Sequence, residues 1–434
     1  MIKVKNLTVQ YRRDPVLKDL NLRVLPGEFV LITGPSGCGK STLARVISGL
    51  IPHAVPAWVQ GKVVVDGRCL LDGSLPDAAQ SVGMVFQNPA SQLFHLSVRE
   101  ELAFGPRNLG LNDEEVEQRV AFALRAVGIE QLALERPDQL SGGQKQLVAI
   151  AAVLAMRPRV LVLDEPTASL DSKSTEQVIA ALTRMSQEQG ITIVLIEHRL
   201  QGALQSVDRV YLMDQGEIIV EGGLEEVFSD PQRRKEFGLR RLGDQGLASW
   251  KELIEKNGSS TSKDEPVLEF NQVSAGYQGE PVIRDINFNI YPGEFTALVG
   301  ENGTGKSTLA LTAAGLIKPS SGEVIFQGGK KPKPGLDVAL LFQNPQEQLF
   351  SNTVREEISF APENFGLLDP EDQILLLQKT GLDPLQDRLP ATLSIGQQLR
   401  TALAASISIH PRLVILDEPT LGQDWGHLSS LMSY

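Results

Sequence analysis

Two stretches of nearly the same ten residues lie 266 positions apart: GPSGCGKSTL begins at Gly34 and GENGTGKSTL begins at Gly300. Further pairs of matching segments accompany both stretches in the same order. These pairs are FQNPASQLF and FQNPQEQLF from Phe86 and Phe342, LSGGQ and LSIGQ from Leu140 and Leu393, and LDEPT from Leu163 and Leu416. Ordered self-similarity of this kind marks a duplicated structural unit. The chain is therefore expected to fold as two copies of one domain.

A polar stretch separates the two copies. Residues 243–266 include NGSSTSKDEP, whose composition is typical of an interdomain linker. We therefore expect a first domain over residues 1–242 and a second over 267–434. After LDEPT the first copy continues through three strand-like runs, at 191–196, 209–213 and 217–220. The sequence ends before any counterpart of these runs, so the second domain is expected to be a C-terminally truncated copy.

Each ten-residue match has the form of a phosphate-binding loop. An apolar strand-like run precedes it, at 29–33 and at 295–299, and helical spacing follows the first one at 41–48. In such loops backbone amides close around the β- and γ-phosphates, the lysine adds a charge, and the serine hydroxyl binds Mg²⁺. The predicted nucleotide-binding residues are Gly34, Pro35, Ser36, Gly37, Cys38, Gly39, Lys40, Ser41 and Thr42, and in the second copy Gly300, Glu301, Asn302, Gly303, Thr304, Gly305, Lys306, Ser307 and Thr308. Ser41 and Ser307 are the predicted magnesium ligands of the two loops.

The LDEPT segments predict paired carboxylates at a strand end. Aliphatic runs at 159–163 and 413–416 lead into Asp-Glu, so a buried parallel strand would deliver both side chains at its carboxyl edge. The first carboxylate, Asp164 or Asp417, is predicted to hold Mg²⁺ directly or through water. The second, Glu165 or Glu418, is predicted to act as general base on the attacking water. An isolated Leu-Asp-Glu is more often a plain strand end, but its spacing from the other motifs favours the catalytic interpretation.

The LSGGQ segment is the most discriminating motif. Ser141 is predicted to cap a helix, and the glycines would let the amide end of that helix approach an anion. An ordinary capped helix is the alternative. Ser141 precedes Asp164 by 23 residues and Ser394 precedes Asp417 by 23 residues, which unrelated helices would not share. The predicted nucleotide contacts are Ser141, Gly143 and Gln144 in the first copy, and Ser394, Gly396 and Gln397 in the second.

These motifs resemble those of the ATP-binding subunits of ATP-binding-cassette transporters, over nearly the whole chain. The resemblance implies an α/β P-loop NTPase fold, with a parallel core sheet, an antiparallel β portion and a helical subdomain carrying LSGGQ. It implies that Tyr11 and Tyr277 stack on adenine, that Gln87 and Gln343 sense Mg²⁺ and the membrane subunit, that the D-loop begins at Ser169, and that His198 contacts the γ-phosphate. Each ATP would lie between the phosphate loop of one domain and the LSGGQ of the other. ATP and Mg²⁺ as cofactors, ATP hydrolysis and head-to-tail pairing of the two domains follow from this resemblance.

A narrower resemblance begins at the Q-loop, the segment that contains Gln87 in the first copy and Gln343 in the second. FQNPASQLFHLSVREELAFGPRNLGL at 86–111 and FQNPQEQLFSNTVREEISFAPENFGL at 342–367 are similar to the ATPases of energy-coupling-factor importers of vitamins, thiamine precursors or transition-metal ions. In that family the segment forms a groove for coupling helices of a transmembrane subunit that carry short basic motifs, and another membrane subunit binds the substrate. The resemblance implies a peripheral protein on the cytoplasmic face of the cell membrane. The candidate acidic partners of the basic motifs are Glu100, Glu101, Glu356 and Glu357, each of which could instead be a solvated helix start.

The second copy departs from the family pattern. In the second copy, Ile395 stands where the first copy has Gly142. Because isoleucine lacks the backbone freedom of glycine, the LSIGQ segment, the signature motif of the second copy, is predicted to approach the γ-phosphate less closely. His198 follows Asp164 by 34 residues, and the sequence contains no counterpart at that distance from the second LDEPT. The better equipped catalytic set is therefore predicted to be Lys40 with Asp164, Glu165 and His198.

Composition narrows the alternatives. A formal charge of −12 argues against nucleic acid as the main partner, and two cysteines are too few for a disulfide framework or a four-thiolate zinc site. We expect no structural metal. The longest aliphatic run, 147–156, is half of the ~20 residues that span a bilayer, so membrane spans would belong to other subunits. Two other hypotheses remain open: a soluble tandem cassette ATPase acting on ribosomes or DNA, and a truncated, non-catalytic product.

Overall fold

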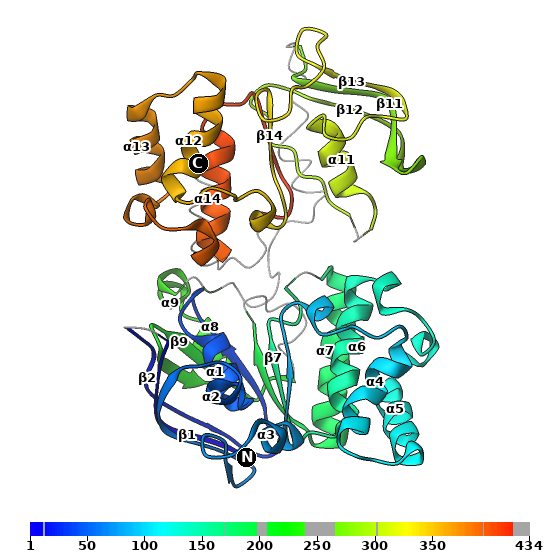
Figure 1. The fold of residues 1–434 in the computed structure, drawn as a ribbon, viewed down its shortest axis with the longest axis vertical. Helices are drawn as coiled ribbons and strands as arrows, with labels where there is room; N and C mark the ends of the chain where they lie inside the picture. The colour runs from blue at the N-terminus through cyan, green and yellow to red at the C-terminus, as the bar shows by residue number, and fades with distance from the viewer. Residues whose placement is uncertain are drawn as a thin grey trace. The chain divides into compact units, whose positions relative to one another are not determined.

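The computed structural model describes all residues except 12–13, 169, 198–205, 238, 240–264, 301–302, 394 and 420–434. The described residues form two compact units, one within residues 1–245 and the other within 246–423. In Figure 1 the first unit runs from blue to green and the second from yellow-green to red. None of the helices in the described part of the chain combines the length and the apolar character that a membrane crossing needs.

The first unit is built on a six-stranded sheet with the order β10-β9-β3-β8-β7-β6. Its strands are β3 (Phe29–Thr33), β6 (Val82–Val85), β7 (Val160–Asp164), β8 (Thr192–Ile196), β9 (Arg209–Asp214) and β10 (Glu217–Gly222). β10 is antiparallel to β9, and all other neighbours are parallel. Every residue of β3, β7 and β8 is buried, as expected for aliphatic runs covered on both faces. Because parallel strands share their carboxyl edge, the segments that follow these three strands meet there.

Different layers cover the two faces of this sheet (Figure 1). Phe29 and Leu31 of β3 belong to the apolar cluster that the longer helices α4 to α7 form, whereas Val30 and Ile32 belong to a second cluster with α1. The alternation follows from the two-residue period of a strand. The helices are α1 (Lys40–Ile47), α2 (Leu50–His53), α3 (Leu75–Ser81), α4 (Val98–Asn108), α5 (Asp113–Val127), α6 (Gly142–Leu154), α7 (Ser172–Gln189), α8 (Leu224–Phe228) and α9 (Pro231–Glu236).

A four-stranded antiparallel sheet, in the order β2-β1-β4-β5, packs into the same cluster as α1. Its strands are β1 (Ile2–Gln10), β2 (Pro15–Val24), β4 (Trp58–Val65) and β5 (Arg68–Cys69). Alternate residues of β2 are buried along most of its length, so one face of the sheet meets the core. The predicted combination of a parallel core sheet, an antiparallel β portion and a helical subdomain is therefore confirmed in the first unit.

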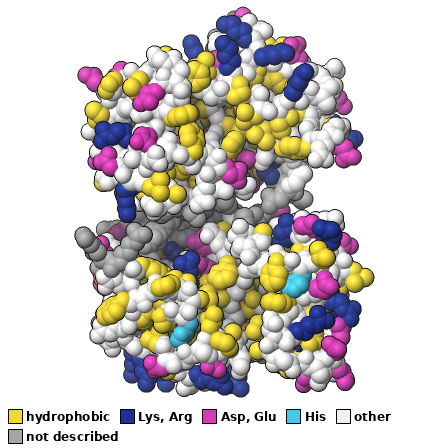
Figure 2. Space-filling view, viewed as in Figure 1, with side chains coloured by type: hydrophobic (Ala, Val, Ile, Leu, Met, Phe, Trp, Pro, Cys, Tyr) yellow, Lys and Arg dark blue, Asp and Glu magenta, His cyan; other side chains and the backbone are white. Residues whose placement is uncertain are grey.

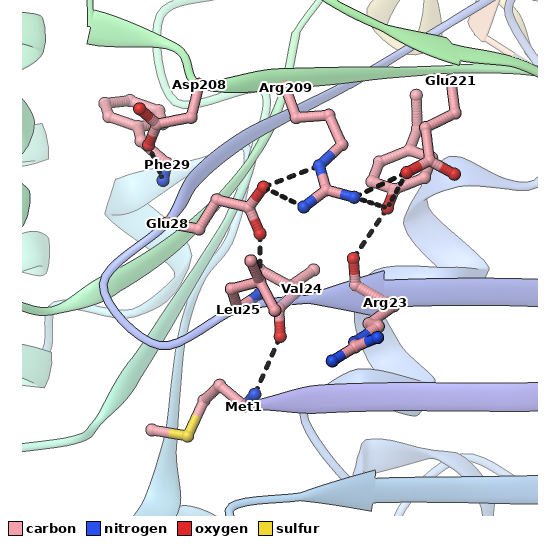
Figure 3. A network of polar contacts seen from close by, with 10 residues as sticks. Met1, Arg23, Val24, Leu25, Glu28, Phe29, Asp208, Arg209 and Glu221 are labelled. Atoms are coloured by element: carbon pink, nitrogen blue, oxygen red, sulfur yellow. Dashed lines mark hydrogen bonds and ion pairs between the residues drawn. The ribbon is translucent and has the colours of Figure 1, made fainter.

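A polar network around Arg209 ties the two sheets of the first unit together (Figure 3). The guanidinium of Arg209, at the start of β9, donates from Nε to Glu28 Oε1 at 2.7 Å and from an Nη to Glu221 Oε1 at 2.6 Å. Glu28 in turn accepts the N–H of Leu25 at 2.6 Å, and the hydroxyl of Tyr211 donates to the carbonyl of Arg23 at 2.7 Å. Burial raises the pKa of Tyr211 to about 12, so this hydroxyl remains a donor at neutral pH.

The second unit repeats part of this plan. A three-stranded antiparallel sheet has the order β12-β11-β13, and β14 pairs in parallel with β15. The strands are β11 (Leu268–Tyr277), β12 (Glu280–Ile290), β13 (Ser321–Phe326), β14 (Val338–Leu341) and β15 (Leu413–Leu416), and the helices are α11 (Lys306–Ala313), α12 (Val354–Phe365), α13 (Pro370–Lys379) and α14 (Ile395–Ile407). The elements follow the same order as those of the first unit as far as β7, except that β3, α2, β5 and α3 have no counterpart among the described residues of the second unit.

The prediction of a strand at 295–299 is wrong. These residues form no strand in the structure, and Phe295, Leu298 and Val299 have exposed fractions of 78%, 55% and 68%. In the first unit the corresponding strand, β3, gains its hydrogen bonds from β8 and β9 on either side. The described part of the second unit contains no counterpart of either neighbour. An aliphatic run without a neighbouring strand has nothing to complete its backbone hydrogen bonds, so its sequence alone does not make it a strand.

Candidate functional site

The predicted phosphate loop of the first unit connects β3 to α1. Gly34 has a φ of 146°, and a Cβ at this position would lie 2.0 Å from the carbonyl oxygen of Met213, so only glycine fits. Gly39 adopts a left-handed conformation with a φ of 108° and caps the amino end of α1. The strand, turn and helix that the sequence predicts are therefore present. The amide end of α1 faces the loop and supplies the positive end of a helix dipole.

Lys40 lies inside this loop. Its side chain is buried, and Nζ donates to the carbonyl oxygens of Gly34 at 2.9 Å and Pro35 at 2.8 Å. In the second unit Nζ of Lys306 donates to the carbonyl oxygen of Gly300 at 2.9 Å. Both ammonium groups are thus held over their loops by weak acceptors, which phosphate oxygens would replace with stronger, charge-assisted bonds.

Ser41 and Asp164 meet although they are 123 residues apart in sequence. Ser41 lies in the first turn of α1, Asp164 ends β7, and the Ser41 hydroxyl donates to Asp164 Oδ1 at 3.0 Å. Burial raises the pKa of Asp164, while the hydrogen bond from Ser41 acts in the opposite direction. A hydroxyl and a carboxylate oxygen at this distance fit Mg²⁺, which prefers hard oxygen ligands and takes others from water and phosphate. No group of three or more acidic, histidine or cysteine side chains that could hold a metal by itself occurs among the described residues.

Glu165 and Gln87 also come together. Gln87 Nε2 donates to Glu165 Oε2 at 3.1 Å, and the second unit repeats the contact between Gln343 Nε2 and Glu418 Oε2 at 2.8 Å. Glu165 has a φ of 48° and Glu418 a φ of 49°, a left-handed conformation that is uncommon outside glycine. The Q-loop amide and the candidate general base are therefore in direct contact in both units.

The LSGGQ segment forms the predicted helix cap. Ser141 Oγ accepts the N–H of Gln144 at 3.3 Å, Gln144 Oε1 accepts the N–H of Ser141 at 2.9 Å, and α6 begins at Gly142. A Cβ at Gly143 would lie 2.5 Å from Ser174 Oγ, so that glycine is required by packing.

The backbone of the first unit does not support the conformational reason for expecting a weakened signature motif at Ile395. The corresponding residue, Gly142, has no positive φ, and a Cβ there would meet its nearest neighbour, a methyl of Leu170, at an ordinary 3.6 Å. An L-residue could therefore adopt the backbone conformation of Gly142 without strain, and a Cβ would have room there. Any effect of Ile395 would have to come from its side chain.

The predicted adenine-stacking residues lie at the ends of corresponding strands. Tyr11 follows β1, is 37% exposed, and its hydroxyl lies 3.3 Å from Thr42 Oγ1 in α1. Tyr277 ends β11 and is 51% exposed. Tyr11 therefore presents an accessible ring beside the first phosphate loop, where a base attached to a bound triphosphate would lie.

Several predicted residues lie outside the described part of the chain. They are Ser169, His198, Glu301, Asn302 and Ser394. The structure also reveals residues that motif reasoning missed. Glu197 and Thr167 are both 1% exposed and joined by hydrogen bonds beside Glu165. The available signal was a charged residue at the end of an otherwise aliphatic strand.

Cys38 tests the electrostatics of the phosphate loop. Lys40 Nζ lies 3.7 Å from Cys38 Sγ, yet burial outweighs this charge and raises the pKa of the thiol. We expect iodoacetamide at pH 7 to label Cys38 at least roughly tenfold more slowly than the half-buried Cys69. The rate at Cys38 should rise as the pH approaches its raised pKa, and MgATP should slow it further. Peptide mass spectrometry over a labelling time course measures both rates, and equal rates would contradict this account.

Comparison with known proteins gives consistent matches. A family model described as ABC transporter matches residues 17–168 and 283–421. A putative ABC transporter ATP-binding protein of Methanosarcina mazei is 35% identical over 478 aligned positions, covering 100% of this chain and 82% of that protein. One from Methanosarcina acetivorans is 37% identical, covering 99% of this chain and 78% of that protein. A solved structure titled as cbiO1 from Clostridium perfringens, part of the ABC transporter complex cbiONQ, is 35% identical with a TM-score of 0.48, covering 54% of this chain and 92% of that one.

Proposed function

The chain belongs to the ABC transporter family, as an ATP-binding protein with two ABC domains that couples ATP hydrolysis to transport, and we propose that it serves an energy-coupling-factor type importer. Its substrate would be a vitamin, a thiamine precursor or a transition-metal ion, bound by a separate membrane subunit. A transmembrane coupling subunit would dock on the segments that follow Gln87 and Gln343, and the protein would work at the cytoplasmic face of the cell membrane.

The observation that carries this proposal is an apolar hollow beside the second Q-loop. A cavity of about 300 Å³ is lined by residues of β14, α12 and α14 and by the intervening segment, among them Phe342, Leu349, Phe350 and Phe360. Phe342 immediately precedes the Q-loop glutamine. The hollow therefore lies where a docked helix could move Gln343, and through it Glu418.

Exposed aromatic pairs mark the same place in both units. Phe94 and Phe104 meet edge to face at 5.1 Å between ring centroids, and Phe350 and Phe360 do so at 4.7 Å. Phe94 is 66% exposed and Phe350 is 65% exposed. Figure 2 shows other apolar side chains reaching the visible surface between charged ones, as is usual for proteins. A repeated pair of large exposed rings at equivalent positions instead supports a docking surface.

The acidic residues beside these rings divide into two kinds. Glu101 and Glu357 are buried, and each accepts two backbone N–H groups of the preceding loop, from Phe94 and His95 and from Phe350 and Ser351. Their prediction as partners of a basic motif is therefore wrong, because each carboxylate is buried and its Oε2 already holds the loop in place. Glu100 and Glu356 are exposed and remain the proposed acidic contacts.

The catalytic roles complete the proposal. Lys40 and the phosphate-loop amides would bind the triphosphate, Ser41 and Asp164 would hold Mg²⁺, and Glu165 would take a proton from the attacking water. When bound, Mg²⁺ supplies charge neutralisation on the β- and γ-phosphates. Gln87, which bonds Glu165, would report on events at the docking surface. Head-to-tail pairing of the two domains around ATP is part of the same proposal.

Docking is tested by removing the rings. The double substitutions Phe94→Ser with Phe104→Ser, and Phe350→Ser with Phe360→Ser, should reduce binding to membranes containing the integral membrane proteins encoded beside this gene by at least roughly tenfold. ATP turnover of the isolated chain should stay within about twofold, because these rings do not contact the phosphate loop. Sedimentation with the membranes and a phosphate-release assay measure the two quantities.

Ile219→Ser provides a matched control, since Ile219 is 46% exposed and lies in β10, at the opposite edge of the sheet from β6, the strand that precedes Gln87. Unchanged membrane binding of both ring variants would contradict the proposed docking surface. Reconstituted complexes that accumulate none of the three substrate classes with ATP would contradict the importer assignment.

A further inference from the structure

Glu197 is a buried carboxylate at the end of an apolar strand. It directly follows β8, whose five residues are all buried, and its own exposed fraction is 1%. Its backbone N–H donates to the carbonyl of Ile32 at 3.2 Å, in the strand that leads into the phosphate loop. Burying a carboxylate is costly unless hydrogen bonds compensate for lost water. The Glu197 carboxylate is therefore expected to accept hydrogen bonds from buried neighbours.

The Glu197 side chain holds the segment after β7. Its Oε1 accepts the N–H of Thr167 at 3.0 Å and also accepts a short hydrogen bond from the Thr167 hydroxyl. Thr167 is itself buried and lies two residues beyond Glu165. The carbonyl of Ile196 accepts the N–H of Glu165 at 2.9 Å. Two consecutive residues at the end of β8 thus bind both ends of the turn that carries Glu165.

That turn needs support. Glu165 has a φ of 48°, and non-glycine residues adopt this region only where surrounding contacts impose it. Within the turn, the N–H of Ala168 donates to the carbonyl of Glu165 at 3.2 Å, a bond that closes the turn without tying it to the sheet. Ile196, which ends β8, and Glu197, which follows it, therefore fix the backbone of the turn that carries Glu165, whose carboxylate also contacts Gln87.

We propose that Glu197 is a positioning residue for ATP hydrolysis, whose carboxylate clamps Thr167 and so fixes the turn that presents Glu165 to the attacking water. The inference rests on the general-base role proposed for Glu165. Because Glu197 acts on Glu165 through Thr167, its loss should change the chemical step more than ATP binding. Misplacing a catalytic group by about 1 Å can cost roughly 100-fold in rate.

The test separates kcat from KM in the full-length chain. Glu197→Ala should lower kcat for MgATP hydrolysis at least roughly tenfold while changing KM less than about threefold. Glu197→Gln retains an acceptor oxygen for Thr167, so it should keep kcat within about threefold. Thr167→Val removes the hydroxyl and should give an intermediate loss, which Thr167→Ser should restore. The double variant Thr167→Val with Glu197→Ala should have nearly the same kcat as Glu197→Ala alone, because both substitutions remove the same interaction.

Thr192→Val is the matched control. Thr192 begins β8, at the opposite end of the strand from Glu197, is fully buried, and its hydroxyl accepts the N–H of Gly27 at 2.9 Å. Its loss should lower thermal stability as much as Thr167→Val does without lowering kcat. A drop in kcat equal to that of Thr167→Val would overturn the proposal, since the effect would then be general destabilisation.

Other outcomes are equally decisive. A folded Glu197→Ala variant with the kcat of the original chain overturns the inference, and so does an equal loss in Glu197→Gln and Glu197→Ala with no rescue by Thr167→Ser. If Glu197→Ala does not fold, the kcat values of the Thr167 variants decide the question by themselves. Glu165→Gln is assayed in parallel: high turnover in that variant removes the proposed base itself, whereas low turnover there with normal Glu197→Ala removes only the clamp.

Discussion

Replacing Glu165 with glutamine should lower the ATP turnover of the chain at least ~100-fold while leaving its affinity for MgATP within about threefold. Glutamine keeps the size of the side chain and an acceptor oxygen for Gln87 Nε2, which lies 3.1 Å from Glu165 Oε2. It cannot take a proton from water. The loss should therefore appear in kcat and not in binding, as measured by single-turnover hydrolysis and by titration with a fluorescent nucleotide.

Two further variants serve as comparisons for Glu165→Gln. Glu418→Gln should cause a smaller fall, because residues 295–299 before the second phosphate loop form no strand, whereas β3 anchors the first loop. Glu114→Gln changes an exposed glutamate at the start of α5 and should have no effect. Turnover within about threefold of the original chain in Glu165→Gln would show that another group is the base.

Replacing Arg209 with methionine should destabilise the first unit by about 2–4 kcal/mol. The substitution leaves Glu28, whose side chain is 8% exposed, without the cation that pairs with it, while Glu221 is 50% exposed and can turn to water. Arg209 is also held charged, since its hydrogen bonds with Glu221 and Glu28 raise its pKa despite partial burial. Hydrogen exchange of the amides in β3 and β9 measures the change in the first unit alone.

The control for this prediction is an exposed ion pair. Arg136 and Asp138 lie 2.9 Å apart, but their side chains are 54% and 62% exposed. Arg136→Met should therefore leave the exchange rates of the amides in β3 and β9 unchanged. Adding Glu28→Gln to Arg209→Met should recover part of the loss, because it removes the unpaired charge. Equal effects at Arg209 and Arg136 would contradict a cooperative network.

The phosphate loops and capped signature helix were predictable because their determinants are local. Glycines at positions with positive φ, a lysine and serine opening a helix, and a serine three residues before a glutamine all act within one turn of chain. The magnesium roles predicted for Asp164 and Ser41 require the two side chains to lie close together, and their hydrogen bond at 3.0 Å is consistent with those roles. They meet because the chain returns to the carboxyl edge of the parallel sheet.

Features that depend on distant neighbours were not predictable in this way. The run at 295–299 has the composition of a strand but none of its partners within the described part of the second unit. Glu101 and Glu357 follow an exposed-looking pattern at a helix start, and only the loop that folds back on them buries their carboxylates. Glu197 belongs to none of the sequence motifs, and only the folded chain brings its side chain to Thr167. In each case tertiary contacts decided what the residue does.

The pairing of β3 has a consequence for synthesis of the protein. β3 ends at Thr33, but its neighbours β8 and β9 end at Ile196 and Asp214, so this aliphatic strand leaves the ribosome well before either partner exists. At about 5–20 residues per second the wait is roughly 10 to 40 s. During that interval an aggregation-prone strand is unpaired on the nascent chain, which makes chaperone binding to this segment advantageous. Translation speed between residues 34 and 214 is therefore expected to influence the soluble yield of the protein.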